Sequence, residues 1–350
     1  MRILIAEDSV LLRAGLVRLL EEGGHEIIGA VGDAGALVDA ARTLQPELAL
    51  VDVRMPPTLT DDGLRAALVI RRDHPDIAIL VLSQYVEETY ASELLAGLVP
   101  AEIFASSPMA ALQAQAVAAR GQLLAKIGTR HLDDPFLLCS EQHCQVYAGR
   151  IREHERTTKA VRETAGKVAL RPGETQLVDT VYSANCGGHS EDNDLVWPSA
   201  ADPQLRGQPD LLLEKKFAKG ITDDNIAAFL RGSPRSYSVP EPEISRTAYR
   251  WRETLDPSSL AGNPGIDAAL GTVRELQVRS RGRSGRAMVL RVIGEHGEID
   301  LHGELRIRKA LGGLRSSLFV VESERDHGRI VLTGGGHGHG VGLCQHGAMG

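Results

Sequence analysis

Short apolar runs and helical patterns alternate four times at the start of this chain, and this alternation constrains the fold more than any other feature. Apolar runs of strand length cover residues 3–6, 26–30, 48–53 and 77–82. Each run is followed by a helical pattern, at residues 10–20, 34–41, 63–72 and 87–96. Continuous apolar strands alternating with helices predict a parallel sheet buried on both faces, with functional side chains at the carboxyl ends of the strands. We therefore expect four βα units over residues 1–97.

Acidic side chains stand at two of these strand ends. Glu7 and Asp8 follow the first strand, and Asp52 ends the third. Three converging carboxylates suit a hard cation such as Mg²⁺, and with the cation offsetting their repulsion Asp52 can act as a nucleophile toward a phosphoryl donor. Ser83, at the end of the fourth strand, is placed to contact an incoming phosphate. The alternative is a set of merely solvated carboxylates.

An amphipathic helix is predicted to begin near Pro108. Its apolar positions are spaced three and four apart and form one buried stripe: Met109, Leu112, Ala116, Ala119 and Leu123. Gln113 and Arg120 lie two turns apart on another face, where they either point toward a common ligand or form a solvated polar face. Glu102 precedes this helix, and we expect it in a loop suited to a reactive carboxylate.

A cluster of cysteines and histidines follows the helix. Its candidate ligands are His131, Cys139, His143 and Cys144. These residue types match a tetrahedral Zn²⁺ site, and four protein ligands leave no open position for water, so the zinc would be structural. Reduced, buried thiols or a disulfide are the alternatives. The other two cysteines, Cys186 and Cys344, are left unassigned.

The rest of the chain reads mainly as strands and glycine-rich loops. Residues 177–182 predict a strand that runs into Gly187 and Gly188, where paired glycines permit close approach to a ligand. Residues 204–265, rich in proline, predict an insertion with one helix around residues 225–231. Alternating runs predict an antiparallel meander at residues 273–278, 288–293 and 299–307.

Glycine and histidine alternate near the end of the chain, over residues 334–348. So much glycine around histidine and glutamine favours a site lined by backbone. A histidine-rich metal loop is one alternative. A disordered tail is another, although Val341 and Leu343 favour burial.

Charge and hydropathy exclude several classes of partner. The net charge is −7, and no run of lysine or arginine marks a patch for nucleic acid, so we expect no nucleic-acid partner. No segment offers the roughly 20 apolar residues of a membrane helix. The first apolar run is too short for a signal peptide, so as written the chain is expected to be soluble and cytoplasmic.

The first 97 residues resemble two-component receiver domains, which have a flavodoxin-like α/β fold. The resemblance rests on Ile5-Ala6-Glu7-Asp8-Ser9, Val51-Asp52-Val53-Arg54-Met55-Pro56 and Leu80-Val81-Leu82-Ser83. It implies that Asp52 is phosphorylated, with a sensor histidine kinase as partner, that Glu7 and Asp8 help bind Mg²⁺, and that Ser83 is the switch hydroxyl.

The resemblance to receivers is incomplete. Receivers have five βα units, the fifth carrying a phosphate-binding lysine, whereas here no lysine precedes Lys126. We therefore expect a truncated, vestigial receiver with four of the five units and an exposed edge at its fourth strand.

Residues 98–350 resemble the SpoIID/LytB family, which includes sporulation proteins with lytic transglycosylase activity on peptidoglycan and relatives described as amidase enhancers. The resemblance rests on Pro100-Ala101-Glu102, the run from Ala111 to Arg120, His143-Cys144-Gln145-Val146-Tyr147, Tyr182-Ser183-Ala184-Asn185-Cys186-Gly187-Gly188 and the Gly-His-rich end. It implies a mixed α+β domain, Glu102 as catalytic acid/base, a zinc site in the Cys-His cluster, and peptidoglycan glycan strands and a cell-wall amidase as partners. Candidates for holding the sugars are Gln113, Arg120, Tyr182, Ser183, His339 and Gln345.

One carboxylate suffices for this chemistry. Most glycosidases need two, but in a lytic transglycosylase the C6 hydroxyl of N-acetylmuramic acid attacks the anomeric carbon and gives a 1,6-anhydro end. Glu102 first protonates the leaving oxygen, so we expect burial to raise its pKa. This wall substrate lies outside the cytoplasm in which a receiver works. The alternatives are a signalling protein controlled by Asp52 and a chimera without an evolved joint function.

Overall fold

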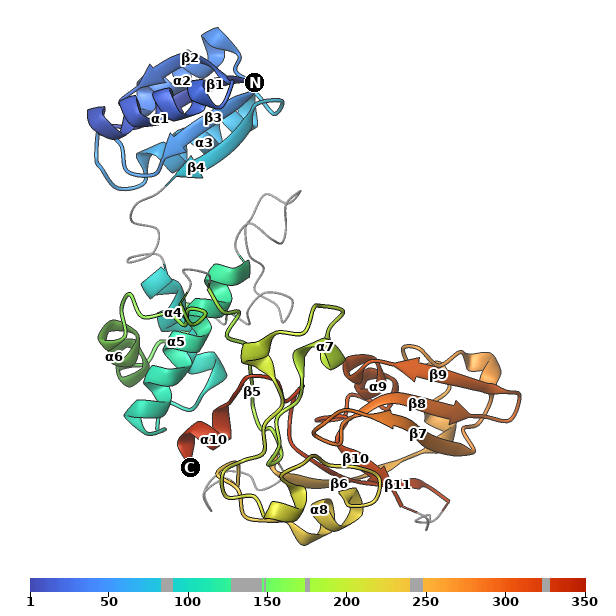
Figure 1. The fold of residues 1–350 in the computed structure, drawn as a ribbon. Helices are drawn as coiled ribbons and strands as arrows, with labels where there is room; N and C mark the ends of the chain where they lie inside the picture. The colour runs from blue at the N-terminus through green and yellow to red at the C-terminus, as the bar shows by residue number, and fades with distance from the viewer. Residues whose placement is uncertain (83–90, 127–146, 148, 174–176, 240–247, 323–327) are drawn as a thin grey trace. The chain divides into compact units, whose positions relative to one another are not determined.

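The computed structural model describes residues 1–82, 91–126, 147, 149–173, 177–239, 248–322 and 328–350 (Figure 1). The chain forms two compact units, Met1–Tyr90 and Ala91–Gly350, and each is described here by itself. The observed boundary follows Tyr90. The predicted boundary, after Gly97, lies seven residues farther along the chain, inside a helix of the second unit.

The first unit is a parallel sheet of four strands in the order β2-β1-β3-β4. The strands are β1 (Arg2–Ala6), β2 (Glu26–Val31), β3 (Leu48–Asp52) and β4 (Ala78–Leu82). They alternate with α1 (Val10–Glu22), α2 (Ala34–Leu44) and α3 (Asp62–Asp73). Side chains of Ser9 and Asp33 cap α1 and α2. The predicted flavodoxin-like α/β fold is confirmed.

Side-chain alternation along the strands decides which helix covers which face. Leu4 of β1 packs with Leu37 of α2 and Ala66 of α3, whereas Ile3 and Ile5 pack against α1. The prediction that every strand is buried on both faces is wrong for β4, because its Leu80 is 52% exposed. The expected exposure of this edge strand is confirmed among the described residues.

The helix predicted at residues 87–96 does not complete a fourth βα unit. It is α4 (Ala91–Glu102), and it belongs to the second unit. Leu95, Leu98 and Val99 of α4 pack with Leu112 and other residues of α5 (Met109–Lys126). The reason is the apolar stripe of α5, which is buried as predicted and needs a covering helix. The helix α6 (Glu155–Glu163) and the short turn η2 (Arg150–Arg152) complete this helical layer.

The second unit also contains two antiparallel sheets of three strands each. The order β10-β11-β6 joins β10 (Phe319–Val321), β11 (Ile330–Gly335) and β6 (Arg250–Leu255). The predicted meander is β7 (Glu275–Arg281), β8 (Ala287–Ile293) and β9 (Glu298–His302). The strand predicted to reach residue 307 ends at His302, because Gly303 at φ 92° turns the chain into α9 (Glu304–Ala310).

The predicted insertion is only partly separate from the fold. Its expected helix is α8 (Ile226–Gly232). However, β6 also lies within residues 204–265 and pairs with β11, and the buried indole of Trp251 donates to the carbonyl of Gly336. The end of this segment is therefore part of the core sheet. Short helical segments complete the unit: α7 (Asn193–Val196), η3 (Pro203–Leu205), η4 (Lys215–Phe217), η6 (Pro257–Ser259) and η7 (Ala268–Leu270).

A short parallel pair brings two distant segments together. β5 (Tyr182–Ser183) pairs with β12 (Leu343–Cys344), and α10 (Gln345–Met349) follows directly. The strand predicted at residues 177–182 is shorter than expected, because before Tyr182 only Leu177 makes a bridge, to Leu170. Among the described residues, no helix combines the length and hydropathy needed to cross a membrane.

Candidate functional site

Three separate parts of the second unit converge on Glu102. Glu102 is the last residue of α4. The expectation that it lies in a loop before the next helix is therefore wrong. The Tyr182 hydroxyl and the Gln345 amide donate hydrogen bonds to its carboxylate. Tyr182 and Gln345 are placed by the β5-β12 pair, where Tyr182 aligns with Leu343, two residues before Gln345. The structure therefore brings together three of the predicted site residues.

Burial raises the pKa of the Glu102 carboxyl above its ordinary value. Desolvation outweighs three effects that lower the pKa: the Gln345 amide, the Lys126 charge and the Tyr182 hydroxyl. A carboxyl that stays protonated at higher pH, yet has donors ready for its ionised form, suits a group that first gives a proton and later takes one. The predicted rise in pKa is confirmed. Lys126, a buried residue at the end of α5, is a member of this site that the sequence analysis missed.

Gln115 is a second residue that the sequence analysis missed. Its Oε1 accepts a hydrogen bond from Nε2 of Gln345 at 3.3 Å, and its own Nε2 is buried without a hydrogen-bond partner. The side chain is 0% exposed. Its spacing from Leu112 and Ala119 places it on the buried stripe of α5, and a polar residue on that stripe is the signal that could have identified it.

Gln113 and Arg120 contact α6 and the residues after it rather than Glu102. Nε2 of Gln113 donates to Glu163 at 2.9 Å. The buried Arg120 guanidinium donates to the carbonyls of Lys167 and Val161, at 2.9 and 3.2 Å. These two side chains therefore hold α5 to the α6 segment, and the expectation that they share a ligand is not met by their contacts.

His339 and Ser183 lie beside Tyr182. A ring nitrogen of His339 donates a hydrogen bond to the backbone carbonyl of Tyr182. The imidazole packs edge-on against the indole of Trp197, with 4.7 Å between the ring centroids. Burial and two nearby arginines lower the pKa of His339 well below its ordinary value, so this imidazole is neutral at physiological pH. The Ser183 hydroxyl is buried without a hydrogen-bond partner. The second ring nitrogen of His339, Nδ1, accepts from the backbone N–H of Val341 at 3.1 Å, so both nitrogens are bonded within the chain. The spare hydroxyl of Ser183 is a suitable group for a hydrogen bond to a sugar.

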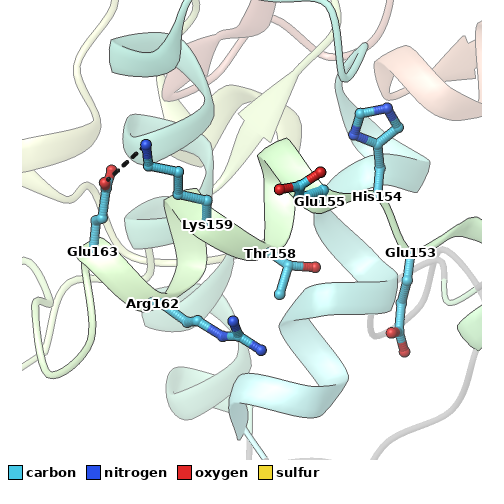
Figure 2. A pocket seen from close by; sticks show the side chains of 7 residues that line it. All are labelled: Glu153, His154, Glu155, Thr158, Lys159, Arg162 and Glu163. Atoms are coloured by element: carbon cyan, nitrogen blue, oxygen red, sulfur yellow. Dashed lines mark ion pairs between the residues drawn. The ribbon is translucent and has the colours of Figure 1, made fainter.

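A shallow depression lies along one side of α6, apart from the Glu102 site (Figure 2). Lys159 and Glu163, one turn apart on α6, form an ion pair at 3.7 Å between Nζ and Oε1. Its lining shares no residue with the Glu102 site: Glu153, His154, Glu155, Thr158, Lys159, Arg162 and Glu163. Gln113 reaches this depression through its contact with Glu163.

The first unit gathers its three predicted carboxylates at the carboxyl ends of β1 and β3. One oxygen of each of Glu7, Asp8 and Asp52 lies within 4.8 Å of the others. Burial raises the pKa of both Glu7 and Asp52, and neighbouring carboxylates in the cluster raise it further, although backbone amides oppose this. Such repulsion is relieved by a divalent cation, and oxygen ligands at this spacing fit Mg²⁺. Asp8 is exposed, which leaves the cluster open to solvent.

Five predicted site residues lie outside the described residues. They are the switch hydroxyl Ser83 and the zinc candidates His131, Cys139, His143 and Cys144. The zinc site stays a prediction from the sequence.

Comparison with known families finds matches to two families in the first half of the chain. Residues 3–99 match the family described as response regulator receiver domain, and residues 83–170 match SpoIID, described as stage II sporulation protein. The chain is therefore similar to receivers over its first part and to SpoIID over the segment that follows. This confirms both resemblances. Residues 191–342 also match a domain of unknown function.

Individual relatives match one part or the other. The amidase enhancer of Bacillus subtilis (strain 168) is 25% identical over 268 residues, 73% of this chain and 37% of that protein. An uncharacterised protein of Brachyspira hyodysenteriae is 29% identical over 76% of this chain and 62% of its own length. The transcriptional regulatory protein PdtaR of Mycobacterium tuberculosis is 40% identical over 85 residues, 24% of this chain and 40% of that protein. The chain thus spans less than two thirds of each of these relatives.

Proposed function

We propose that the SpoIID part cleaves peptidoglycan glycan strands as a lytic transglycosylase, with Glu102 as its single acid/base. The observation that carries this proposal is the setting of Glu102: a desolvated carboxyl of raised pKa that also receives hydrogen bonds from Tyr182 and Gln345. A glycan strand is the substrate class suggested by the SpoIID match and by the buried polar groups beside Tyr182.

Two proton transfers by Glu102 complete the reaction. In the first, the protonated carboxyl gives its proton to the glycosidic oxygen while the bond from that oxygen to C1 breaks. In the second, the carboxylate takes the proton of the C6 hydroxyl while O6 bonds to C1, which closes the 1,6-anhydro ring. No water is consumed, so a second carboxylate to activate water is unnecessary. Tyr182, Gln345 and the Lys126 charge stabilise the carboxylate between the two steps.

Sugar contacts in this proposal come from Tyr182 and Gln345, which contact Glu102, and from Ser183, the neighbour of Tyr182 in the chain. His339, whose two ring nitrogens are bonded within the chain, holds Tyr182 in place. Gln113 and Arg120 remain candidates only for more distant sugar units, because their described contacts are with α6 and the residues after it. The structural zinc held by His131, Cys139, His143 and Cys144 is proposed on sequence grounds alone. Metal analysis of the purified protein tests it: zinc retained in full by Cys139→Ser contradicts the assignment.

The Glu102→Gln variant tests the proposed reaction. Purified wild type is incubated with glycan strands stripped of their peptides, and the products are identified by mass spectrometry. We expect 1,6-anhydro ends from wild type, none from Glu102→Gln, and unchanged cleavage by the matched control Glu93→Gln, an exposed glutamate on the same helix. Hydrolysed ends without an anhydro ring, or equal cleavage by Glu102→Gln, contradict the proposal.

We propose as a second function that Asp52 accepts a phosphoryl group. The carboxylate oxygens of Glu7, Asp8 and Asp52 lie close enough together to hold a cation, which this reaction needs. Incubation with acetyl phosphate and Mg²⁺ should label wild type and the exposed-site control Asp39→Asn, but not Asp52→Asn. A histidine kinase is the expected natural donor. Equal glycan cleavage by labelled and unlabelled protein would favour a vestigial receiver, or a chimera, over a receiver that controls the enzyme part.

A further inference from the structure

The two cysteines left unassigned by the sequence meet inside the second unit. Cys186 lies three residues after the end of β5, Cys344 ends β12, and the two are 158 positions apart in the chain. The two thiols hydrogen-bond to each other. The Ser238 hydroxyl bridges them, at 3.1 Å from Sγ of Cys186 and 3.2 Å from Sγ of Cys344.

The surroundings make Cys344 the more acidic thiol of the pair. Its Sγ accepts hydrogen bonds from the backbone N–H of Cys186 at 3.2 Å and of Gly347 at 3.3 Å. The thiol of Cys186, the Ser238 hydroxyl and these N–H donors stabilise a thiolate and lower the pKa of Cys344. The hydrogen bond with Cys344, together with burial, raises the pKa of Cys186. Cys344 is also the less buried thiol of the two.

A metal site does not explain the pair. Among the described residues, the ligand atoms that lie close enough together to hold a metal ion are those of Glu7, Asp8 and Asp52 in the first unit. Neither thiol belongs to this group. Simple apolar burial does not explain it either, since Sγ of Cys344 is surrounded by donors. Two thiols in contact, one of them poised to ionise, are the arrangement required for disulfide formation.

We propose that Cys186 and Cys344 are a redox pair that closes to an intramolecular disulfide. The Cys344 thiolate attacks a sulfur of an external disulfide, and the leaving thiolate departs with the electron pair of the broken S–S bond. Cys186 then loses its proton and attacks Sγ of Cys344, which releases the second external thiol. The balance is two protein thiols and one external disulfide giving one protein disulfide and two external thiols.

The disulfide links the loop after β5 to the start of α10. Gln345, the first residue of α10, comes directly after Cys344 and donates to the Glu102 carboxylate. Closing a bridge between residues 158 apart restricts the unfolded chain and stabilises the unit. The bridge places a covalent link one residue before Gln345. The bridge itself does not depend on the proposed glycan cleavage.

Peptide mapping after equilibration tests the bridge. The full chain is equilibrated with mixtures of reduced and oxidised glutathione, alkylated, digested and analysed by mass spectrometry. We expect the Cys186 and Cys344 peptides to lose alkylation in parallel and to appear as one linked peptide. Thermal denaturation of the oxidised protein should show a melting temperature roughly 5–10 °C higher for the second unit.

Single variants provide the controls. Cys186→Ser and Cys344→Ser should each abolish the linked peptide and the rise in melting temperature. Full alkylation of Cys186 and Cys344 at the most oxidising mixture overturns the proposal. So does a mixture that yields only glutathione adducts, or only a Cys139–Cys144 link. These readouts need no glycan substrate, so they separate failure of the bridge from failure of the proposed enzyme activity.

Discussion

The side-chain amide of Gln345 donates a hydrogen bond to Oε1 of Gln115 at 3.3 Å, between residues 230 positions apart in the chain. The same Gln345 side chain donates to the Glu102 carboxylate. Gln115 therefore fixes the orientation of the Gln345 amide. Because the side-chain carbonyl of Gln115 accepts one N–H of this amide, Gln345 presents its other N–H, rather than its oxygen, to Glu102. The predictions below follow from this contact and from the buried charges of the two units.

Replacing Gln115 with leucine should slow glycan cleavage about 10- to 100-fold, because the Gln345 amide loses its anchor. The effect should fall on kcat more than on KM, and the pH at which activity declines should rise, since a rotated amide no longer stabilises the ionised carboxylate. Glu93→Gln, at an exposed position of α4, is the control and should cleave normally. Equal losses in both variants would contradict a specific role for Gln115.

Cleavage should decline as the pH rises through the pKa of Glu102, because the first step needs the protonated carboxyl. Burial raises this pKa above the ordinary value of 4.5, so the decline should occur at a pH above 4.5. The measurement is kcat/KM of wild type across a pH series, with the fold checked by circular dichroism at each pH. A decline centred below 4.5 would show that Glu102 is not the acid.

The Glu102→Gln variant should be more stable than wild type at neutral pH. A folded-state pKa above the unfolded value means that the contribution of Glu102 to stability is present below pH 4.5 and is lost as the pH rises through the folded pKa. Glutamine has no charge to bury, so the difference in melting temperature between variant and wild type should grow from pH 4 to pH 7. An equal difference at both pH values would contradict this reading of the buried carboxyl.

Removing Asp52 should stabilise the first unit when Mg²⁺ is absent. The raised pKa values of Glu7 and Asp52 mean that their contribution is present at low pH and is lost as the carboxylates ionise together. Asp52→Asn relieves this repulsion at pH 7, whereas Asp39→Asn should not. Mg²⁺ should in turn raise the melting temperature of wild type more than that of Asp52→Asn, measured by thermal denaturation with and without the ion.

Replacing Arg120 with alanine should destabilise the second unit by about 2 kcal/mol, because the carbonyls of Lys167 and Val161 lose their donor. Urea denaturation measures the change, with the exposed Arg162→Ala on α6 as control. Unchanged stability together with weaker glycan binding would instead favour the sugar-holding role expected from the sequence.

Local patterns predicted most of the secondary structure correctly. The first three βα units, the fourth strand, α5 and α8 follow the spacing of apolar residues, which depends only on near neighbours in the chain. The pattern was less informative where one glycine ends an element. The strand expected through residue 307 stops at His302, because Gly303 adopts a positive φ and a helix follows.

The sequence by itself determined the two-part division, the strand-end carboxylates and Glu102 as the candidate acid, because these features are encoded in contiguous motifs. Only the tertiary structure decided that α4 packs on α5 rather than on the receiver sheet, and that Gln115 rather than Gln113 reaches the Glu102 site. It also decided that Cys186 meets Cys344. Contacts between residues far apart in the chain depend on which buried surfaces fit together, and the periodicity of a single segment carries no record of that fit.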